Sequence, residues 1–192
     1  MKNLAEIRWH GRGGQGAKTA ALLLGDAAMS LGKHIQAFPE YGPERMGAPV
    51  ASFNRISDEE ITVHYGITEP RIVLVLDPTL MGKVNVTKGL KDDGILIVNT
   101  SDTAAQVRSK VGLDGRKIFT VDASKISKET IGKDIPNTPM LGALIKASNI
   151  LDIQLLLDDL KKKLAKKFAS KPEVIEGNLQ AVKRAYEEVK GE

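Results

Sequence analysis

The N-terminal stretch Ile7–Leu31 limits what this chain can fold into more than any other feature. A short apolar run leads into GRGGQG at Gly11–Gly16, and a long pattern of small and apolar residues follows. This order predicts a strand, a tight glycine turn and a helix, because glycine lets the backbone turn sharply and approach a ligand. The first N–H groups of a helix lack partners and attract anions, phosphates above all. The spacing G-x-G-x-x-G therefore favours a nucleotide or phosphate site.

Two known forms of this fingerprint fit poorly. A dinucleotide site requires an acidic residue about 20 residues further on, but the predicted second strand, Lys33–Phe38, leads through Pro39 to Glu40, a poor position for a ribose ligand. A P-loop requires lysine directly after the last glycine, and here Ala17 precedes Lys18, which rotates the lysine by about 100° around the helix. We therefore do not expect an NTPase. The alternative is that the glycines only allow the helix to pack closely on the strand.

Composition limits the class of protein. The 192 residues, 42% of them apolar and 27% charged, suit one globular domain. The sequence contains neither a run of about 18 apolar residues nor a signal-peptide pattern, so we expect a cytoplasmic protein with no membrane partner. Cysteine is absent, which excludes disulfides, thiolate catalysis and an iron–sulfur cluster held by the thiolates of this chain.

The surplus of lysine does not indicate a nucleic-acid site. The net charge is +4, and the lysines at 161–163 and 166–167 are interleaved with apolar residues from Leu157 to Phe168 at helical spacing. The apolar side of such a helix packs inward and the lysines face water. With 4% aromatic residues, the chain offers few platforms for base stacking, and we expect no nucleic-acid partner.

The residues 39–49, PEYGPERMGAP, form a loop of unusual composition. Its three prolines and two glycines are incompatible with a helix or a central strand. Tyr41, Glu44 and Arg45 supply an aromatic, an acidic and a guanidinium group, the mixture typical of a loop that contacts a ligand or another chain. The alternative is a stiff connecting loop.

The rest of the pattern predicts an α/β fold. Val50–Ile56 and Ile61–Tyr65 alternate apolar and polar residues around a turn and predict an antiparallel hairpin. The apolar runs Arg71–Leu76, Gly94–Val98 and Lys117–Val121 predict parallel strands buried on both faces. Helical patterns follow at 138–149, 153–168 and 172–190. The expected fold is a three-layer αβα, a mostly parallel Rossmann-like sheet that carries an antiparallel hairpin, within a single domain 1–192.

Polar residues follow the buried strands, but no catalytic apparatus accompanies them. Asp77, Asn99 and Asp122 stand where open α/β sheets bind ligands, although for any single one of them helix capping is the better explanation. Asn137 or Thr138 is expected to cap the next helix. His10 ends the first strand and could contact a ligand. The histidines show no metal-ligand spacing, and no G-x-S-x-G elbow is present. A ligand site without catalytic residues indicates a subunit of a larger enzyme.

Several separated motifs together resemble the gamma subunit of 2-oxoacid:ferredoxin oxidoreductases, most closely the pyruvate type. They are Gly11–Gly16, Glu40–Arg45 with Gly47–Pro49, Asp77-Pro78, Gly94–Asn99 and Asn137–Gly142, in this order. The resemblance implies a complex that converts pyruvate and coenzyme A to acetyl-CoA, carbon dioxide and reduced ferredoxin, with alpha, beta and delta subunits as partners. Thiamine diphosphate, magnesium and iron–sulfur clusters would then belong to those partners, and this chain would hold no cofactor alone.

The resemblance and the local chemistry both point to coenzyme A as the ligand of the glycine turn. Its pyrophosphate and ribose phosphate match an anion site at a helix start, with charge supplied by Arg12, Lys18 or Arg45. The loop Tyr41–Pro49 would lie against the alpha and beta subunits, near the channel to thiamine. We expect no catalytic or metal-binding residue in this chain. The candidate binding residues are Gly11, Arg12, Gly13, Gly14, Gln15, Gly16, Lys18, Thr19 and Arg45.

Three alternatives stay open. The chain could be a purely structural assembly subunit with an empty glycine turn. It could be a free-standing Rossmann oxidoreductase that binds a nicotinamide or flavin dinucleotide. It could also be a gamma subunit for another 2-oxoacid, such as 2-oxoglutarate, 2-oxoisovalerate or indolepyruvate, although the residues Glu40–Pro49 favour pyruvate.

Overall fold

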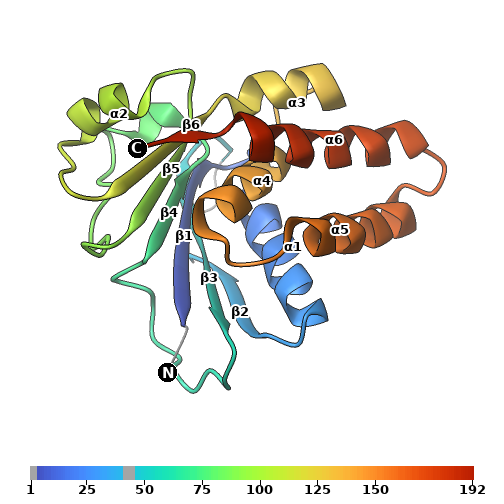
Figure 1. Ribbon diagram of the computed structural model, residues 1–192, viewed down its shortest axis with the longest axis horizontal. Helices are drawn as coiled ribbons and strands as arrows, with labels where there is room; N and C mark the ends of the chain where they lie inside the picture. Colours follow the sequence, from blue (N-terminus) through green and yellow to red (C-terminus); the bar gives the residue numbers. More distant parts are fainter. Residues whose placement is uncertain (1–3, 41–45) are drawn as a thin grey trace.

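The computed structural model describes residues 4–40 and 46–192 and contains a seven-stranded mixed sheet (Figure 1). The strand order is β2-β3-β1-β4-β5-β6-β7. The strands are β1 (Ala5–Arg12), β2 (His34–Pro39), β3 (Pro49–Ser57), β4 (Ile72–Val75), β5 (Ile95–Asn99), β6 (Lys117–Val121) and β7 (Lys190–Gly191). Strands β1, β4, β5 and β6 run parallel in the core, β3 runs antiparallel to β1 and β2, and β7 runs antiparallel to β6. The predicted α/β fold with a parallel core is confirmed.

The helices cover the two faces of the sheet unequally. The helices on one face are α1 (Ala17–Ser30), α3 (Ala123–Ile131), α4 (Asn137–Ser148), α5 (Ile153–Lys167) and α6 (Pro172–Glu188). The other face carries α2 (Ala104–Val111), the 3₁₀ turn η1 (Pro78–Leu80) and irregular chain that contributes Val86 and Leu90 to a second core. The expected three layers are therefore present, with most of the helical mass on one side (Figure 1).

The predicted antiparallel hairpin exists, but its second strand is not the one that the sequence pattern indicated. β3 covers Val50–Ile56 and pairs with β2, the strand that precedes it in the chain. Ile61–Tyr65 forms no strand. A side chain holds this segment instead, because Arg55 Nη2 donates to the carbonyl of Tyr65 at 2.7 Å. β3 already has β1 and β2 on its two edges, so no edge is left for a third partner.

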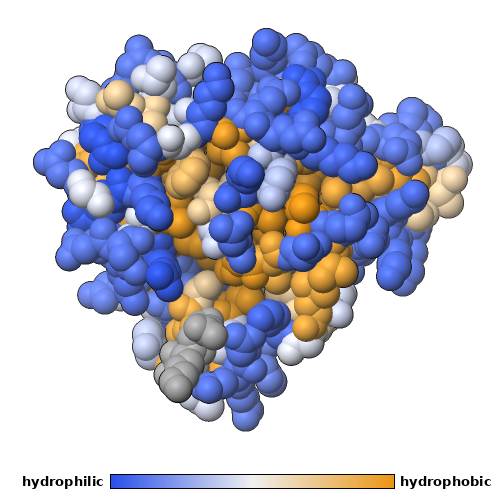
Figure 2. Space-filling model, viewed as in Figure 1, coloured by the Kyte–Doolittle hydropathy of each residue, from blue (hydrophilic) through white to orange (hydrophobic). Residues whose placement is uncertain are grey.

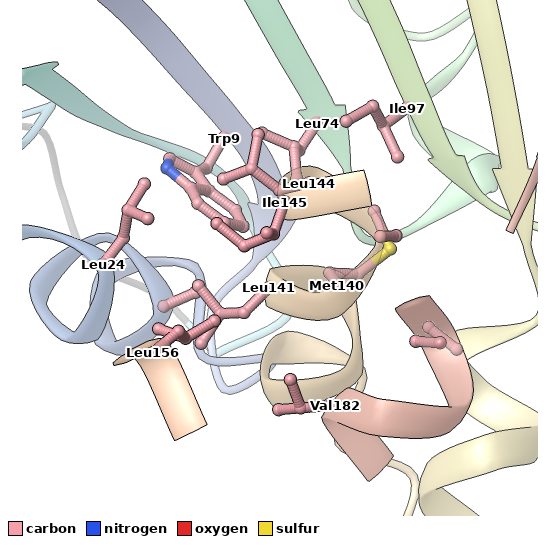
Figure 3. Close-up of a cluster of buried hydrophobic side chains, with 14 of the residues drawn as sticks. Trp9, Leu24, Leu74, Ile97, Met140, Leu141, Leu144, Ile145, Leu156 and Val182 are labelled. Carbon is pink, nitrogen blue, oxygen red and sulfur yellow. The ribbon is translucent and has the colours of Figure 1, made fainter. Parts of the chain in front are cut away.

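Helix α4 lies at the centre of the main core. All its residues from Asn137 to Ile145 are buried, as is typical of a helix surrounded by other elements. Figure 3 shows its side chains between the sheet and the other helices. The labelled residues are Trp9, Leu24, Leu74, Ile97, Met140, Leu141, Leu144, Ile145, Leu156 and Val182. The polar end of Trp9 is satisfied, since its Nε1 donates to Asn54 Oδ1 at 2.8 Å.

The lysine face predicted for α5 is confirmed, with one exception. Leu157 and Leu160 are buried, and the lysines of this helix are exposed apart from Lys163, which is half-buried. Lys163 lies 3.1 Å from Asp26 of α1 and 2.7 Å from Asp159. In the described part of the chain, no helix combines the length and apolar character needed to cross a membrane.

A cleft of about 440 Å³ opens at the amino ends of β1, β4, β5 and β6, beside the end of α4. Its lining combines apolar residues such as Ile56 and Ile72 with Lys33, Arg71 and Lys117. Figure 2 shows apolar surface in the middle of this face, surrounded by hydrophilic side chains. The glycine turn follows the carboxyl end of β1, so the cleft lies at the opposite end of the strands and contains none of the predicted binding residues.

Candidate anion-binding site

The glycine turn connects β1 to α1 as the sequence predicts. Gly14 and Gly16 have φ angles of 97° and 81°, in the left-handed region that favours glycine. Gly16 is the N-cap of α1, no side chain caps the first turn, and this turn contains no acidic residue. Among the residues that the structure describes, a Cβ added to Gly14 would meet nothing within 4 Å, so these residues leave the turn open there. Uncapped N–H groups at an open helix start are suited to bind an anion.

Gly11 lacks the positive φ angle of Gly14 and Gly16 and lies beside α1 and the end of β4. A Cβ at this position would lie 3.4 Å from Ala17 Cβ and 3.7 Å from Leu76 Cβ. These are ordinary van der Waals distances, so the packing of α1 on β1 does not require a glycine at position 11. Close packing, the structural alternative that the sequence left open, therefore explains neither Gly11 nor Gly14, around which the described residues leave space.

Asp77 braces the glycine turn from the end of β4. Its Oδ2 accepts from Arg12 Nε at 2.9 Å and from Gln15 Nε2 at 2.9 Å. Its Oδ1 accepts from the Thr79 N–H at 2.9 Å, which caps η1. Gln15 closes the turn on itself, since its Oε1 accepts from the Arg12 N–H at 2.8 Å. Arg12 is therefore held within the chain, and its guanidinium serves first to fix the turn.

The charge of Asp77 is stabilised by these contacts. Partial burial alone would raise the pKa of this carboxyl, but hydrogen bonds from Thr79, Gln15 and Arg12 outweigh burial and hold the pKa below its usual range. A depressed folded-state pKa stabilises the fold at pH values above the unfolded pKa of about 3.9. This contribution is lost as the pH falls through the lower folded pKa.

We predict that Asp77→Asn lowers the free energy of unfolding by about 1–2 kcal/mol at pH 7, because hydrogen bonds to a charged group are lost. The difference from the parent chain should shrink as the pH falls below about 4, where Asp77 of the unfolded chain becomes protonated, and should vanish once the pH falls below the lower folded-state pKa. Urea unfolding at several pH values measures the loss of unfolding free energy at pH 7 and its decrease at lower pH. Asp92→Asn is the control, because the Asp92 side chain is 98% exposed beside Arg116 and should contribute little. A pH-independent difference would contradict the prediction.

The glycine turn also holds the end of the neighbouring loop. The Gly13 N–H donates to the carbonyl of Ala48 at 2.9 Å, and the Gly47 N–H donates to the carbonyl of Gly13 at 3.1 Å. Arg12 Nη1 donates to the carbonyl of Gly47 at 3.0 Å. Arg45, Tyr41 and Glu44 lie outside the described residues, so their predicted contacts with a ligand or another chain stay predictions.

Lys18 and Thr19 stand exposed on the first turn of α1. Lys18 has no ion-pair partner in the described ranges 4–40 and 46–192. Of the predicted cations that the structure describes, Arg12 is already bound to Asp77, whereas Lys18 can turn toward an anion at the helix start. The structure thus brings together every predicted residue from Gly11 to Thr19.

The other polar residues at the strand ends have structural roles. Asn99 Nδ2 donates to the carbonyl of Leu76 at 2.8 Å, and its Oδ1 accepts from the Ser124 N–H at 3.0 Å, which ties β4, β5 and α3 together. Asp122 caps α3 through the Lys125 N–H at 2.9 Å. The capping explanation holds for Asp122 and, in part, for Asp77.

His10 lies on the opposite face of β1 from Trp9. Burial, together with the positive charge of Arg8, lowers its pKa to about 4, so its imidazole is neutral at neutral pH. Its Nε2 is buried and has no hydrogen-bond partner among the residues described. In this part of the chain, no group of three or more histidine, aspartate and glutamate side chains could hold a metal ion.

Comparison with known proteins decides the family. Residues 6–188 match the family model described as pyruvate ferredoxin/flavodoxin oxidoreductase. The chain is 49% identical over 189 residues to the pyruvate synthase subunit PorC of Thermotoga maritima, covering 98% of this chain and 96% of the relative. The chain belongs to the pyruvate ferredoxin/flavodoxin oxidoreductase family. The resemblance found in the sequence is confirmed.

Other members of the pyruvate ferredoxin/flavodoxin oxidoreductase family agree in sequence and in fold. The pyruvate/ketoisovalerate oxidoreductases common subunit gamma of Pyrococcus furiosus is 44% identical over 184 residues, 96% of each chain. The crystal structure of the pyruvate oxidoreductase subunit PORC from Thermotoga maritima superposes with a TM-score of 0.87 at 45% identity, covering 99% of each chain. The seven-stranded sheet and its helices therefore form the family fold.

The start of α4 differs from the sequence prediction and lies against the glycine turn. The sequence predicted Asn137 or Thr138 as the cap of α4, but the N-cap is Pro136 and Asn137 is the first helical residue. Pro139 lies in the first turn, as predicted. Asn137 lies against Gly16, and this contact between residues far apart in the sequence has no local signal.

Proposed function

We propose that this chain is the gamma subunit of a pyruvate:ferredoxin oxidoreductase, and that its glycine turn binds the phosphates of coenzyme A. The uncapped first turn of α1, open at Gly14 and flanked by Lys18, carries the proposal for the ligand. The near full-length similarity to the pyruvate synthase subunit PorC of Thermotoga maritima supports the proposal for the complex. In this proposal residues 1–192 act as one domain of a cytoplasmic enzyme.

In the proposed complex this chain binds and orients, and its partners carry the chemistry. The N–H groups of the first turn donate to phosphate oxygens, and Lys18 adds a positive charge. Arg12, Gln15 and Asp77 keep the turn in its open conformation. Thiamine diphosphate with magnesium, and iron–sulfur clusters, supply decarboxylation and electron transfer from the alpha, beta and delta subunits, with ferredoxin as acceptor.

We predict that Lys18→Ala in the assembled enzyme raises the KM for coenzyme A by about tenfold, since an interaction with a charged group is worth about 1.4 kcal/mol or more. The KM for pyruvate and the rate of decarboxylation without coenzyme A should stay unchanged, because pyruvate binds and loses carbon dioxide before coenzyme A reacts. Steady-state kinetics with each substrate varied in turn measures the effect.

The control for this experiment is Lys161→Ala, which removes an exposed lysine from α5. It should leave the KM for coenzyme A unchanged. Equal KM values for the parent, Lys18→Ala and Lys161→Ala would contradict a coenzyme site at the glycine turn and would favour a purely structural assembly subunit.

The relative from Pyrococcus furiosus favours a second candidate for the substrate. It is named as a gamma subunit common to pyruvate and ketoisovalerate oxidoreductases. A shared gamma subunit requires that substrate choice resides in other chains, so this chain could serve a second 2-oxoacid as well. Isolation of the native complex, identification of its other subunits and assays with both oxoacids distinguish the two candidates.

A further inference from the structure

The cleft at the amino ends of the strands has an apolar floor that ends in a lysine. Helix α4 ends at Ser148, and the sheet continues beyond it. Ile72 pairs with Ile95 in register, and Ile95 pairs with Lys117, so these three side chains line the cleft from one face of the sheet. Ile95 and Ile150 are half-buried, whereas Lys117 is exposed. The described residues thus leave apolar surface and an amine side by side.

The cations of this cleft differ in their partners. Lys33 pairs with Asp58, and Arg71 pairs with Asp93 at 3.0 Å. Lys117 has no ion-pair partner in residues 4–40 and 46–192. Three cations and two carboxylates therefore line the cleft, which gives it a positive net charge at neutral pH. Lys117 is the position at which a carboxylate from outside the described chain would complete a pair.

Exposed apolar side chains extend this surface beyond the cleft. Met29 of α1 is 58% exposed and Leu155 of α5 is 45% exposed, and each lies within five residues along the chain of a residue that lines the cleft. The two helices meet beside them, where Ser30 Oγ donates to Asp159 Oδ1 at 2.9 Å. In Figure 2 the apolar surface continues from the middle of this face over the region where Figure 1 shows α1 and α5. We call the cleft together with Met29 and Leu155 the amino-end surface.

We propose that the amino-end surface binds another subunit of the complex, through a segment that pairs a carboxylate with Lys117 and packs apolar side chains on Ile95 and Ile150. The inference rests on the proposed complex and is independent of the proposed coenzyme site. Apolar patches rimmed by polar residues mark protein interfaces. The amino-end surface lies at the opposite end of the strands from the glycine turn, so this subunit binds without covering that turn.

The observations favour an acidic protein segment over two other occupants. A small anion in the cleft would leave Met29 and Leu155 exposed to water. A second copy of this chain would repeat the same surface on both sides of a two-fold interface, and two clefts of positive charge would then face each other. A covered lysine without a carboxylate is strongly unfavourable, whereas a paired one selects an acidic partner.

Carbodiimide coupling of the native complex tests the proposed pair. The reagent joins an amine to a carboxylate where the two groups are in contact, and mass spectrometry of the peptides identifies both residues. We expect Lys117 to be coupled to an aspartate or a glutamate of another subunit. Lys117 should also lose most of its reactivity toward acetic anhydride in the complex, relative to the isolated full-length chain, because the partner covers the amine.

Lys117→Glu tests whether the pair contributes to assembly. Lys117 is exposed at the start of β6, so the fold should persist, but like charges then meet in the interface. The concentration of the other subunits needed for half-maximal assembly should rise by about tenfold or more. Lys183→Glu, at an exposed lysine of α6, is the control and should assemble like the parent. Exchange of the coupled carboxylate in the partner for lysine should restore the assembly of Lys117→Glu.

The outcomes separate this inference from the proposed function. Coupling of Lys117 to another subunit, with weakened assembly of Lys117→Glu, supports the interface. If Lys117 in the complex reacts as fast as in the isolated chain, or if Lys117→Glu assembles like the parent, the interface is overturned and the proposed complex stays intact. Coupling to a second copy of this chain, or protection of Lys117 by a small anion without any coupling, would also overturn it. Isolation of the native chain without other subunits would refute the complex and the inference together.

Discussion

Arg55→Ala is expected to lower the free energy of unfolding by about 3–5 kcal/mol, the usual result of removing one partner from a buried ion pair. The Arg55 side chain is 1% exposed, and its Nε lies 2.9 Å from Glu6 Oε1. It also donates to Gln36 Oε1 at 3.0 Å and to the carbonyl of Tyr65 at 2.7 Å. Its guanidinium lies 5.1 Å from the centre of the Tyr65 ring and 5.8 Å from that of Phe38. One side chain thus joins β1, β2, β3 and the segment after β3.

The size of this effect depends on the charge left behind. The Glu6 side chain is 14% exposed, so Arg55→Ala leaves a carboxylate with little access to water. Adding Glu6→Gln should recover part of the loss, because no unpaired charge then remains. Chemical unfolding of the single and double variants measures both effects.

Arg71→Ala is the matched control for Arg55→Ala. Arg71 also pairs with a carboxylate at 3.0 Å, that of Asp93, but the two side chains are 55% and 65% exposed. Exposed pairs contribute about 0–1 kcal/mol. Similar losses in Arg55→Ala and Arg71→Ala would show that burial does not determine the effect and would contradict the prediction.

The role of Arg55 also shows where sequence patterns stop being informative. Continuous apolar runs predicted β4, β5 and β6 closely, because a strand buried on both faces has a local signature. The alternation at Ile61–Tyr65 predicted the second strand of the hairpin, and this prediction is wrong, because side-chain hydrogen bonds from Gln36 and Arg55 hold the segment instead. An alternating pattern does not distinguish a strand paired through backbone hydrogen bonds from a segment bound by side-chain hydrogen bonds. Here the outcome depends on the pairing of both edges of β3, with β1 and β2, and the β1–β3 pairing joins residues far apart in the sequence.

The candidate site also combines features that nearby residues determine with contacts between segments far apart in the sequence. The glycine turn was predictable, because the positive φ angles of Gly14 and Gly16 and the helix that follows are set within a few residues. The brace from Asp77 and the position of Asn137 were not, since each depends on an element that meets the turn only in the folded chain. The sequence analysis noted Asp77 and Asn137 as polar residues before predicted helices, and helix capping was enough to explain a polar residue at each position. Their contacts with the turn required the structure.

Gly142→Ala is expected to destabilise the fold by about 3 kcal/mol, at the upper end of the range for overpacking. Gly142 lies in α4 where this helix crosses α6, and an added Cβ would lie 2.1 Å from the carbonyl oxygen of Val182 and 3.1 Å from the nitrogen of Tyr186. Both are backbone atoms of α6, so relief requires the two helices to move apart. Alanine favours a helix over glycine by about 1 kcal/mol, which offsets only part of this cost.

Gly25→Ala provides the comparison, because Gly25 is also a buried glycine within a helix. Its nearest neighbours would be side-chain atoms, Ile35 Cδ1 at 3.3 Å and Ala37 Cβ at 3.4 Å. Ile35 Cδ1 ends a flexible side chain that can shift by a few tenths of an ångström, and 3.4 Å to Ala37 Cβ is an ordinary contact distance. The helix preference of alanine should therefore keep the stability within about 1 kcal/mol of the parent. Thermal and urea unfolding of both variants measure the contrast, and equal effects would contradict it.

The same substitution links the core to the site. Gly142 and Asn137 lie in one helix, so movement of α4 away from α6 also displaces the Asn137 amide from Gly16. Gly142→Ala should therefore raise the KM for coenzyme A at temperatures where the chain is still folded, whereas Gly25→Ala should not. The Gly142→Ala enzyme can be folded and destabilised and still have the KM for coenzyme A of the parent. That result would mean that the packing of α4 against α6 does not position the coenzyme site.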